Sequence, residues 1–314
     1  MKALVIASML AAGTLSAVPV TAQVAAPASA HATPIPAAAL GLETVRLWQG
    51  RAPEASSDKA DETPTLTIFR PQPGSENGTS VIVAPGGGYM GLSMVSEGRQ
   101  VADWFNSRGI TTFLLQYRVG PKARLPIPLL DGARAVRYVR ANAARFKLNP
   151  NRIGMIGFSA GGHLTATTAG KADAGNATSP DPIERVSSRP DFAILGYPWL
   201  EGMMIEKGGK SQYCMFQGKA CDPKQYVQYR PIDDVTERFP PTFIYHTTAD
   251  NLVGANGIVN FYEALIAKKV PAEMHIFANG PHGSGFGGAD PALARWPELL
   301  ELWLRGQGLL KKEP

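Results

Sequence analysis

The sequence predicts a protein of the α/β class, built on a mostly parallel, doubly wound central sheet with helices on both faces. Two observations carry this prediction. Short apolar segments alternate along most of the chain with amphipathic segments of helical period. Several apolar segments, such as IGMIGF and TFIYHT, lack the polar alternation of a half-exposed strand, as strands covered on both faces must. The 314 residues, 44% of them hydrophobic, are enough for one such domain.

The first 22 residues have the features of an export signal. Lys2 precedes an apolar stretch, and the small residues Val20 and Ala22 flank Thr21 in the pattern of a cleavage site after Ala22. The apolar stretch is too short, and too interrupted by glycine, serine and proline, to span a bilayer comfortably. We therefore expect an exported protein, periplasmic or extracellular, that has no membrane contact after cleavage. An uncleaved anchor or a disordered tail is the alternative.

Residues 23–63 are rich in Ala, Pro, Ser and Thr and have little periodicity, so we expect a linker or a loosely attached arm before a domain at residues 64–314. Within the arm, LETVRLWQG, residues 42–50, is the candidate for docking on that domain. Within that domain we expect strands at 66–69, 81–85, 111–117, 152–158, 192–197, 242–247 and 272–278, and helices at 97–109, 129–146, 160–170, 258–269 and 292–307. The stretch between Tyr197 and Pro240 breaks this alternation and is expected to pass over one end of the sheet.

Charge and cysteines narrow the classes of function. The formal net charge is +5, and the basic residues are dispersed along helical segments rather than gathered with aromatics, which argues against a nucleic-acid partner. Cys214 and Cys221 have no histidine cluster or CxxC spacing beside them, so no metal site is expected. A local disulfide between them and two free thiols both remain open.

The strongest local motif is G-F-S-A-G, Gly157 to Gly161, between a predicted strand and a predicted helix of small residues. In a nucleophile elbow the serine occupies a sharp, strained turn, which requires small residues two positions before and after it. Ser159 would then project its hydroxyl above the sheet, beside the unsatisfied N–H groups of the following helix. The motif predicts a nucleophilic serine.

A serine hydroxyl needs a base, and the base needs a carboxylate that orients it. His282 lies in a glycine-rich loop just past a late strand and is the expected base. Asp250 directly follows the strand TFIYHT, where catalytic groups gather in parallel sheets, and is the expected acid. The alternative role for Asp250 is that of a helix N-cap, and Asp290 is a second candidate for the acid. The chain order Ser159, Asp250, His282 is that of the α/β-hydrolases.

The segment PGGGY, residues 85–89, also follows a strand. Acyl transfer puts negative charge on a carbonyl oxygen, and glycines let backbone N–H donors approach it. We expect an oxyanion hole formed by Gly87, Gly88 and Ala160, with Tyr89 lining the acyl pocket. A dinucleotide loop is excluded because the G-x-G-x-x-G pattern with its later acidic residue is not matched as a unit. A purely structural turn is the alternative.

Four other residues near these motifs have plainer expected roles. Glu97 is expected as a charge at a helix N-terminus. His163 is expected to pack or form hydrogen bonds on the helix after the serine rather than act as a second base. Trp199 and Tyr213 are expected either to stack against sugar or aromatic rings of a substrate or to pack in the core.

Five segments together resemble secreted bacterial α/β-hydrolases related to acetyl xylan esterases and feruloyl esterases. These segments are PGGGYMGLSMVSEG, FLLQYRV, LDGARAVRYVRANAARFKLNPNRIGMIGFSAGGHL, HTTADNLV and PHGSGF. The resemblance covers roughly residues 64–308 and departs at Gly254, where the relatives have a proline. It implies an α/β-hydrolase fold and a carbohydrate-ester deacylase with Ser159, Asp250 and His282 as its triad.

We therefore expect an exported serine esterase that removes small acyl groups, acetyl first, from a plant-type polysaccharide or oligosaccharide without a metal or an organic cofactor. The expected partner is an acylated carbohydrate or another small ester. A general carboxylesterase or a feruloyl esterase is the alternative among enzymes. A non-catalytic binding module that kept the fold is the alternative from another class, because fold alone does not determine function. The sequence makes no prediction of the oligomeric state.

Overall fold

The computed structural model describes residues 41–200, 206–207, 210–211, 227–288 and 290–310. The predicted export signal at residues 1–22 lies outside these residues, as does the predicted linker up to residue 40. Cys214, Cys221 and Tyr213 lie outside them as well. What the sequence predicts for these segments stays a prediction.

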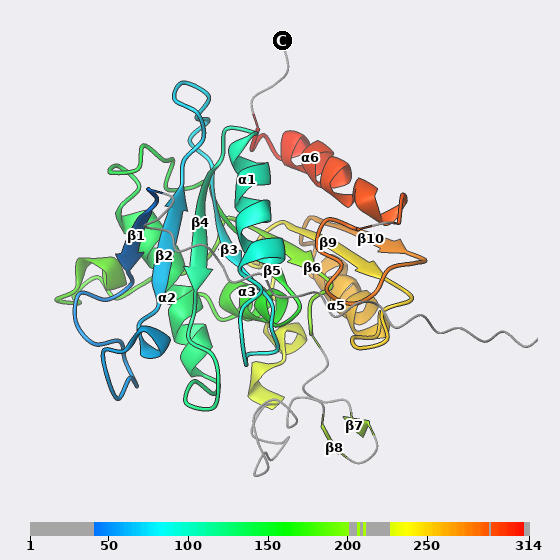
Figure 1. Ribbon diagram of the computed structural model, residues 1–314, viewed down its shortest axis with the longest axis horizontal. Coiled ribbons are helices and arrows are strands. Elements are labelled where there is room, and N and C mark those ends of the chain that lie inside the picture. Colours follow the sequence, from blue (N-terminus) through cyan, green and yellow to red (C-terminus); the bar gives the residue numbers. More distant parts are fainter. Residues whose placement is uncertain (1–40, 201–205, 208–209, 212–226, 289, 311–314) are drawn as a thin grey trace, which may run out of the picture. The chain divides into compact units, whose positions relative to one another are not determined.

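A mixed sheet is the centre of the described part of the chain (Figure 1). Its strands are β1 (Glu43–Arg46), β2 (Thr65–Phe69), β3 (Ser80–Ala84), β4 (Thr111–Gln116), β5 (Ile153–Phe158), β6 (Phe192–Gly196), β9 (Thr242–Thr247) and β10 (Ala272–Phe277). They lie in the order β1-β2-β4-β3-β5-β6-β9-β10. β2 runs antiparallel to both of its neighbours, and the other neighbouring strands pair in parallel. The sheet is therefore mostly parallel, as predicted.

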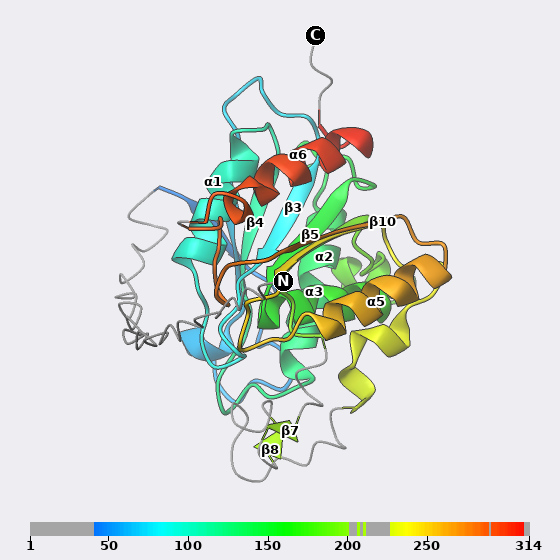
Figure 2. The ribbon, with the colours of Figure 1, turned by 90° about the vertical axis from the view of Figure 1, so that its right-hand side faces the viewer.

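Helices cover both faces of this sheet. They are α1 (Gln100–Asn106), α2 (Ile127–Ala141), α3 (Ala160–Gly170), α5 (Asn256–Ala267) and α6 (Trp296–Gly306). Side chains of α1 and α6 share one core cluster, whereas α2, α3 and α5 contribute to the clusters on the opposite face. The two groups of helices lie on opposite sides of the strands (Figure 2).

Shorter elements complete the described chain. The 3-10 turns are η2 (Ala60–Glu62), η4 (Pro182–Arg185), η6 (Pro231–Asp234) and η7 (Leu293–Arg295), and η3 (Val95–Arg99) is π-helical. A small antiparallel pair joins β7 (Glu206–Lys207) and β8 (Lys210–Ser211). Among the helices that the structure describes, none has the length and apolar character needed to cross a bilayer.

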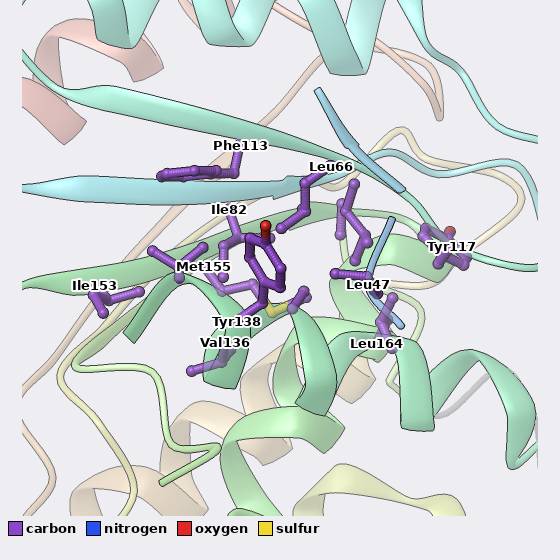
Figure 3. Packing of buried hydrophobic residues seen from close by; sticks show 14 of the residues in the cluster. Leu47, Leu66, Ile82, Phe113, Tyr117, Val136, Tyr138, Ile153, Met155 and Leu164 are labelled. Atoms are coloured by element: carbon purple, nitrogen blue, oxygen red, sulfur yellow. The ribbon is translucent and has the colours of Figure 1, made fainter. Parts of the chain in front are cut away.

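The central strands are apolar on both faces because each face is covered. All residues of β3 and β5 are buried. Along β3, Val81 and Val83 belong to the cluster under α1 and α6, whereas Ile82 belongs to the cluster under α2. Figure 3 shows the second cluster, in which Tyr138 of α2 lies near Met155 of β5. This close-packed scaffold fixes the strand ends from which the loops start.

Residues 43–46, inside the candidate docking segment of the expected linker or arm, are part of the sheet. They form β1, which pairs antiparallel with β2, and the next residue, Leu47, is buried in the core. The strand is only four residues long, and its ends, Glu43 and Arg46, are charged. Such a short polar segment carries little strand signal of its own, because its pairing with β2 is a tertiary contact.

The loops after β3, β5, β9 and β10 hold the predicted catalytic and oxyanion residues. Because these four strands are parallel members of one sheet, their carboxyl ends lie at the same edge. The topology therefore gathers residues that are far apart in the chain.

Candidate active site

Ser159 lies at the turn between β5 and α3, in an unusual backbone conformation. Its φ is 52° and its ψ is −118°, outside the regions that non-glycine residues usually occupy. The Ser159 N–H donates a hydrogen bond to the Gly196 carbonyl at 3.1 Å, and the Trp199 N–H donates to the Ser159 carbonyl at 3.0 Å. Both bonds come from β6 and the residues that follow it, so the neighbouring strand holds the turn in place.

Close backbone contacts explain the two glycines of the elbow motif. A β-carbon on Gly157 would lie 2.0 Å from the carbonyl oxygen of Gly161. A β-carbon on Gly161 would lie 2.1 Å from the carbonyl oxygen of Ala84, at the end of β3. The steric reason predicted for these small residues is confirmed.

Ser159, His282 and Asp250 form a continuous series of hydrogen bonds. Nε2 of His282 lies 2.7 Å from Oγ of Ser159, and Nδ1 lies 2.7 Å from Oδ2 of Asp250. Ser159 is 8% exposed, and the side chains of His282 and Asp250 are 14% and 1% exposed. The structure thus brings together the three residues that the sequence singled out, with the acid shielded and the other two reachable.

Asp250 is held as a carboxylate. Its Oδ1 accepts hydrogen bonds from the N–H groups of Leu252 and Val253, each at 2.9 Å. Burial alone raises the pKa of Asp250, but the hydrogen bonds from His282 and the two amides outweigh burial and hold that pKa below its ordinary value. An ionised carboxylate only accepts hydrogen bonds, so Nδ1 of His282 carries the proton. Nε2 then presents its lone pair to the hydroxyl of Ser159.

The glycine loop, residues 85–89, uses carbonyl groups as acceptors for amides that follow it in the chain. The Met90 N–H donates to the Gly87 carbonyl at 3.0 Å, and the Ser93 N–H donates to the Gly86 carbonyl at 2.9 Å. The glycines make this fold of the loop accessible, because Gly87 adopts a φ of +136° that side chains rarely permit.

Three amide groups remain available beside Ser159. Among the hydrogen bonds of the described residues, the N–H groups of Gly87, Gly88 and Ala160 have no protein acceptor. Ala160 is the first residue of α3, where a helix leaves its N–H groups unsatisfied. A β-carbon on Gly86 would lie 3.0 Å from Cβ of Ser159, so the glycine loop passes directly beside the serine. This arrangement suits the binding of a small anion.

Tyr89 does not line an acyl pocket, contrary to the expectation. Its side chain is 0% exposed, and its hydroxyl lies 2.6 Å from Nδ1 of His163. The backbone of Tyr89 has a φ of +59°, which turns the ring into the core. Tyr89 therefore anchors the glycine loop to α3, the helix that follows Ser159.

His163 has the structural role expected for it. Its Nε2 lies 2.7 Å from the carbonyl oxygen of Tyr229. A carbonyl oxygen only accepts, so Nε2 carries the proton and Nδ1 accepts from the hydroxyl of Tyr89. Burial lowers the pKa of His163 to about 4, so the imidazole is neutral at pH 7.

Trp199 also lies in the core. It is 3% exposed and belongs to the same cluster as Leu164 and Val253. Of the two roles considered for Trp199, core packing is the one that the structure shows, and a stacking wall for a substrate is wrong. The backbone N–H of Trp199 donates to the carbonyl oxygen of Ser159 at 3.0 Å, which holds this residue beside the turn that carries the serine.

Two other titratable residues, Asp290 and His246, have structural contacts. Asp290, the second candidate for the acid, accepts a hydrogen bond from the N–H of Leu293, the first residue of η7, at 2.8 Å. Nε2 of His246 lies 3.0 Å from the carbonyl oxygen of Val253, which places it behind Asp250. Within the described part of the chain, no three His, Cys, Asp or Glu side chains gather as they would around a metal ion.

Two residues that the sequence analysis did not place in the site lie against it. Glu97, expected at a helix N-terminus, is 5% exposed within η3. Its Oε2 accepts from the N–H of Gly86 and its Oε1 accepts from the hydroxyl of Tyr197, each at 2.7 Å. The ring of Tyr197 stands edge-on to His282 with the ring centroids 5.2 Å apart. The position of Tyr197, just after a buried strand, was the available signal. No local pattern marks Glu97, because its partners are distant in sequence.

Comparisons with known sequences match most of this domain. A model of the BD-FAE family matches residues 66–265. An acetylxylan esterase of Xylanibacter ruminicola is 36% identical over 228 residues, which cover 71% of this chain and 44% of that protein. The chain spans about half the length, or less, of the curated relatives that it matches.

Solved structures share the fold. The crystal structure of an acetyl ester-xyloside bifunctional hydrolase from Caldicellulosiruptor lactoaceticus superposes with a TM-score of 0.78 at 35% identity, covering 86% of this chain and 97% of that one. A thermophilic esterase of Thermogutta terrifontis with propionate bound has a TM-score of 0.69 at 26% identity, covering 87% and 97%. These likenesses confirm the predicted α/β-hydrolase fold and the predicted resemblance to acetyl xylan esterases.

Proposed function

The chain belongs to the BD-FAE family of α/β-hydrolases, and on this premise we propose that it is a serine esterase that hydrolyses small acyl esters of carbohydrates, acetyl esters above all. One observation carries the proposal: the hydrogen-bonded series from Ser159 through His282 to Asp250, with 2.7 Å at each step. Three amide donors support it, since the N–H groups of Gly87, Gly88 and Ala160 have no protein acceptor among the described residues and are available for the charge that an ester carbonyl oxygen gains.

In the first half of the proposed reaction, Oγ of Ser159 forms a bond to the carbonyl carbon of the ester. Nε2 of His282 takes the hydroxyl proton, and the carboxylate of Asp250 stabilises the imidazolium that results. The charge that develops on the carbonyl oxygen is met by the N–H groups of Gly87, Gly88 and Ala160. The imidazolium then gives its proton to the leaving alcohol oxygen as the carbon–oxygen bond breaks. The acyl group remains on the serine.

In the second half, water takes the place of the alcohol. His282 removes a proton from the water as its oxygen attacks the acyl carbon, and the same proton returns to Oγ of Ser159 when the carboxylic acid leaves. The sum is ester and water converted to acid and alcohol, with the side chains restored.

The carbohydrate part of the proposal is supported by two relatives. One is named an acetylxylan esterase and another an acetyl ester-xyloside bifunctional hydrolase, at 36% and 35% identity. A general carboxylesterase is the second candidate, because the esterase of Thermogutta terrifontis, with propionate bound, shares the fold at 26% identity.

The test of the chemistry is a substitution of the serine. Ser159→Ala should lower kcat for p-nitrophenyl acetate by at least about 10⁴-fold, because the nucleophile is lost. Urea unfolding and circular dichroism of the same preparation check that the variant is folded. A folded Ser159→Ala variant that keeps most of its activity would end the proposal. A folded wild type with no activity on any ester would favour a non-catalytic binding module.

The test of the substrate is a panel of esters. We compare kcat/KM across the panel. The value for acetate release from acetylated xylan and other acetylated glycans should be the highest. It should exceed the values for p-nitrophenyl butyrate, p-nitrophenyl octanoate and methyl ferulate. A preference for longer acyl chains, with no acetate released from any glycan, would favour the general carboxylesterase. A preference for methyl ferulate would favour the feruloyl esterase.

We also propose that residues 1–22 export the protein to the periplasm or out of the cell, as the pattern of the leader indicates. Expression of the full chain in a bacterial host, followed by fractionation and N-terminal sequencing, tests this. The mature protein should begin at Gln23 and leave the cytoplasmic fraction. A cytoplasmic protein that still begins at Met1 would contradict it.

A further inference from the structure

A buried carboxyl group joins two loops of the candidate site. Glu97 is 5% exposed, and each of its oxygens accepts one hydrogen bond at 2.7 Å. The donor to Oε2 is the N–H of Gly86, in the glycine loop, and the donor to Oε1 is the hydroxyl of Tyr197, after β6. The proposed reaction uses neither Glu97 nor Tyr197. Burying an ionisable group lowers the stability of the fold unless the group is well hydrogen-bonded, so we asked what this contact does for the protein.

Tyr197 extends the contact to the loop that carries the base. This loop, residues 280–288, is called the histidine loop below. The hydroxyl of Tyr197 accepts a hydrogen bond from the N–H of Gly285 at 3.1 Å, while the ring stands edge-on to His282. On its other side, the Gly285 carbonyl accepts from the hydroxyl of Tyr245 and from Nε1 of Trp296, each at 3.0 Å. The peptide groups at Gly285 are therefore fixed in both directions.

The contact at the glycine loop is equally close to the nucleophile. A β-carbon on Gly86 would lie 2.7 Å from Oε2 of Glu97 and 3.0 Å from Cβ of Ser159. Gly86 thus lies between the carboxyl group and the serine. A shift of the carboxyl group would move this residue, and with it the neighbouring N–H groups of Gly87 and Gly88.

We propose that Glu97 and Tyr197 are positioning residues that hold the glycine loop and the histidine loop in register with each other. The inference rests on the proposed function, because it assigns them the alignment of the oxyanion donors with the base. Neither residue touches the substrate in this scheme. Their effect is on the transition state, where a misplacement of about 1 Å costs up to about 100-fold in rate.

Three variants test the inference. Glu97→Ala removes both acceptors. Glu97→Gln keeps the shape but leaves one acceptor oxygen for two donors, so the contact with one loop is lost or must reverse, with the amide donating to the hydroxyl of Tyr197. Tyr197→Phe keeps the ring against His282 but removes the hydroxyl that reaches Glu97 and Gly285. Glu62→Ala is the matched control, since Glu62 is another buried glutamate, 7% exposed, whose bonds go to serines of the N-terminal segment.

The measurement is kcat and KM for p-nitrophenyl acetate, with the unfolding free energy of each variant in urea. We expect kcat to fall by about 10- to 100-fold in Glu97→Ala and by less in Glu97→Gln, with KM changed by no more than about threefold, because a displaced oxyanion donor costs less than a deleted one. Glu62→Ala should lose stability without this loss of kcat. The double variant Glu97→Gln with Tyr197→Phe should have a kcat within about twofold of that of the slower single variant, since both changes break the same chain of contacts.

The possible results separate this inference from the proposed function. An active wild type with kcat of Glu97→Ala and Tyr197→Phe within about twofold of it would overturn the positioning role alone. The same holds if the losses in Glu97→Gln and Tyr197→Phe multiply in the double variant. If Glu97→Ala does not fold, Glu97→Gln and Tyr197→Phe carry the test. An inactive wild type would overturn the proposed function and this inference with it.

Discussion

Lowering the pH should destabilise the folded protein through His163, because its imidazole is neutral in the fold and takes up a proton in the unfolded chain. The ordinary pKa of histidine is 6.5, and burial lowers that of His163 to about 4. Between these values the unfolded state binds more protons than the folded state, so the free energy of unfolding falls as the pH drops through this window. The contribution of the neutral imidazole is fully present above pH 6.5 and lost toward pH 4.

The magnitude follows from the gap between the two pKa values. At about 1.4 kcal/mol for each pKa unit, the full loss is roughly 3 kcal/mol, of which about 2 kcal/mol is lost by about pH 5. The cause is burial. The ring of His163 is 0% exposed, so the positive charge of its protonated form would lose its contact with water.

The assay is urea unfolding of wild type and His163→Gln at about pH 7.5 and about pH 5. The variant has no imidazole to protonate, so we expect its deficit in unfolding free energy against wild type to shrink by about 2 kcal/mol at the lower pH. Leu164→Ala, the next buried residue on α3, is the matched control, and its deficit should be the same at both values. A deficit of His163→Gln that stays constant within about 0.5 kcal/mol would refute the reasoning.

Three further predictions concern the scaffold. Gly161→Ala should lower kcat and lower the free energy of unfolding in urea by about 1–3 kcal/mol, because its methyl group would lie 2.1 Å from a backbone oxygen of β3. The control Gly306→Ala meets no atom within 4 Å and should leave kcat unchanged, so equal effects of the two variants would count against this steric account. Asp131→Asn should lower the free energy of unfolding in urea by about 3–5 kcal/mol, because the Arg118 side chain, 2% exposed, would keep its charge without a carboxylate beside it. A loss below about 1 kcal/mol would contradict this prediction. Hydrogen bonds from neighbouring serines lower the pKa of Glu62 to about 2, so its carboxylate stabilises the fold at neutral pH. At neutral pH the free energy of unfolding in urea should therefore be lower for Glu62→Gln than for wild type, and this difference should vanish as the pH falls from about 4.5 to about 2; a constant difference would contradict the prediction.

Much of the candidate site was predictable from local sequence, because each part follows a strand. Ser159, Asp250 and His282 come directly or shortly after β5, β9 and β10, and the glycine loop follows β3. Parallel strands of one sheet end at the same edge, so recognising the strands was enough to expect these residues close together. The steric need for glycine at the elbow is also a local property and was readable from spacing alone.

The direction of side chains next to these motifs was not predictable in the same way. Tyr89 follows the glycines in sequence, but its positive φ and its bond to His163 turn the ring into the core. Trp199 is likewise drawn inward, and core packing alone decides its role. Neither the backbone angle nor the partner helix is encoded in the neighbouring residues, so adjacency to a motif was a poor guide to contact with a substrate.

Contacts between segments that are distant in the chain were also not predictable from the sequence. The bond between Glu97 and Tyr197 joins residues 100 positions apart, and the strand β1 exists only through its pairing with β2. In both cases the local sequence is short or charged. The deciding interaction belongs to the folded chain, which is why Glu97 was expected at a helix end instead.

The most direct test of the central claim is labelling with a fluorophosphonate probe, with the modified residue identified by mass spectrometry. The claim is that the hydroxyl of Ser159 is made nucleophilic by His282, 2.7 Å away. The account predicts one label per chain, located on Ser159, and a large loss of labelling rate in a folded His282→Ala variant. A folded protein that takes no label, or that is labelled at another residue while Ser159 stays unmodified, would contradict it.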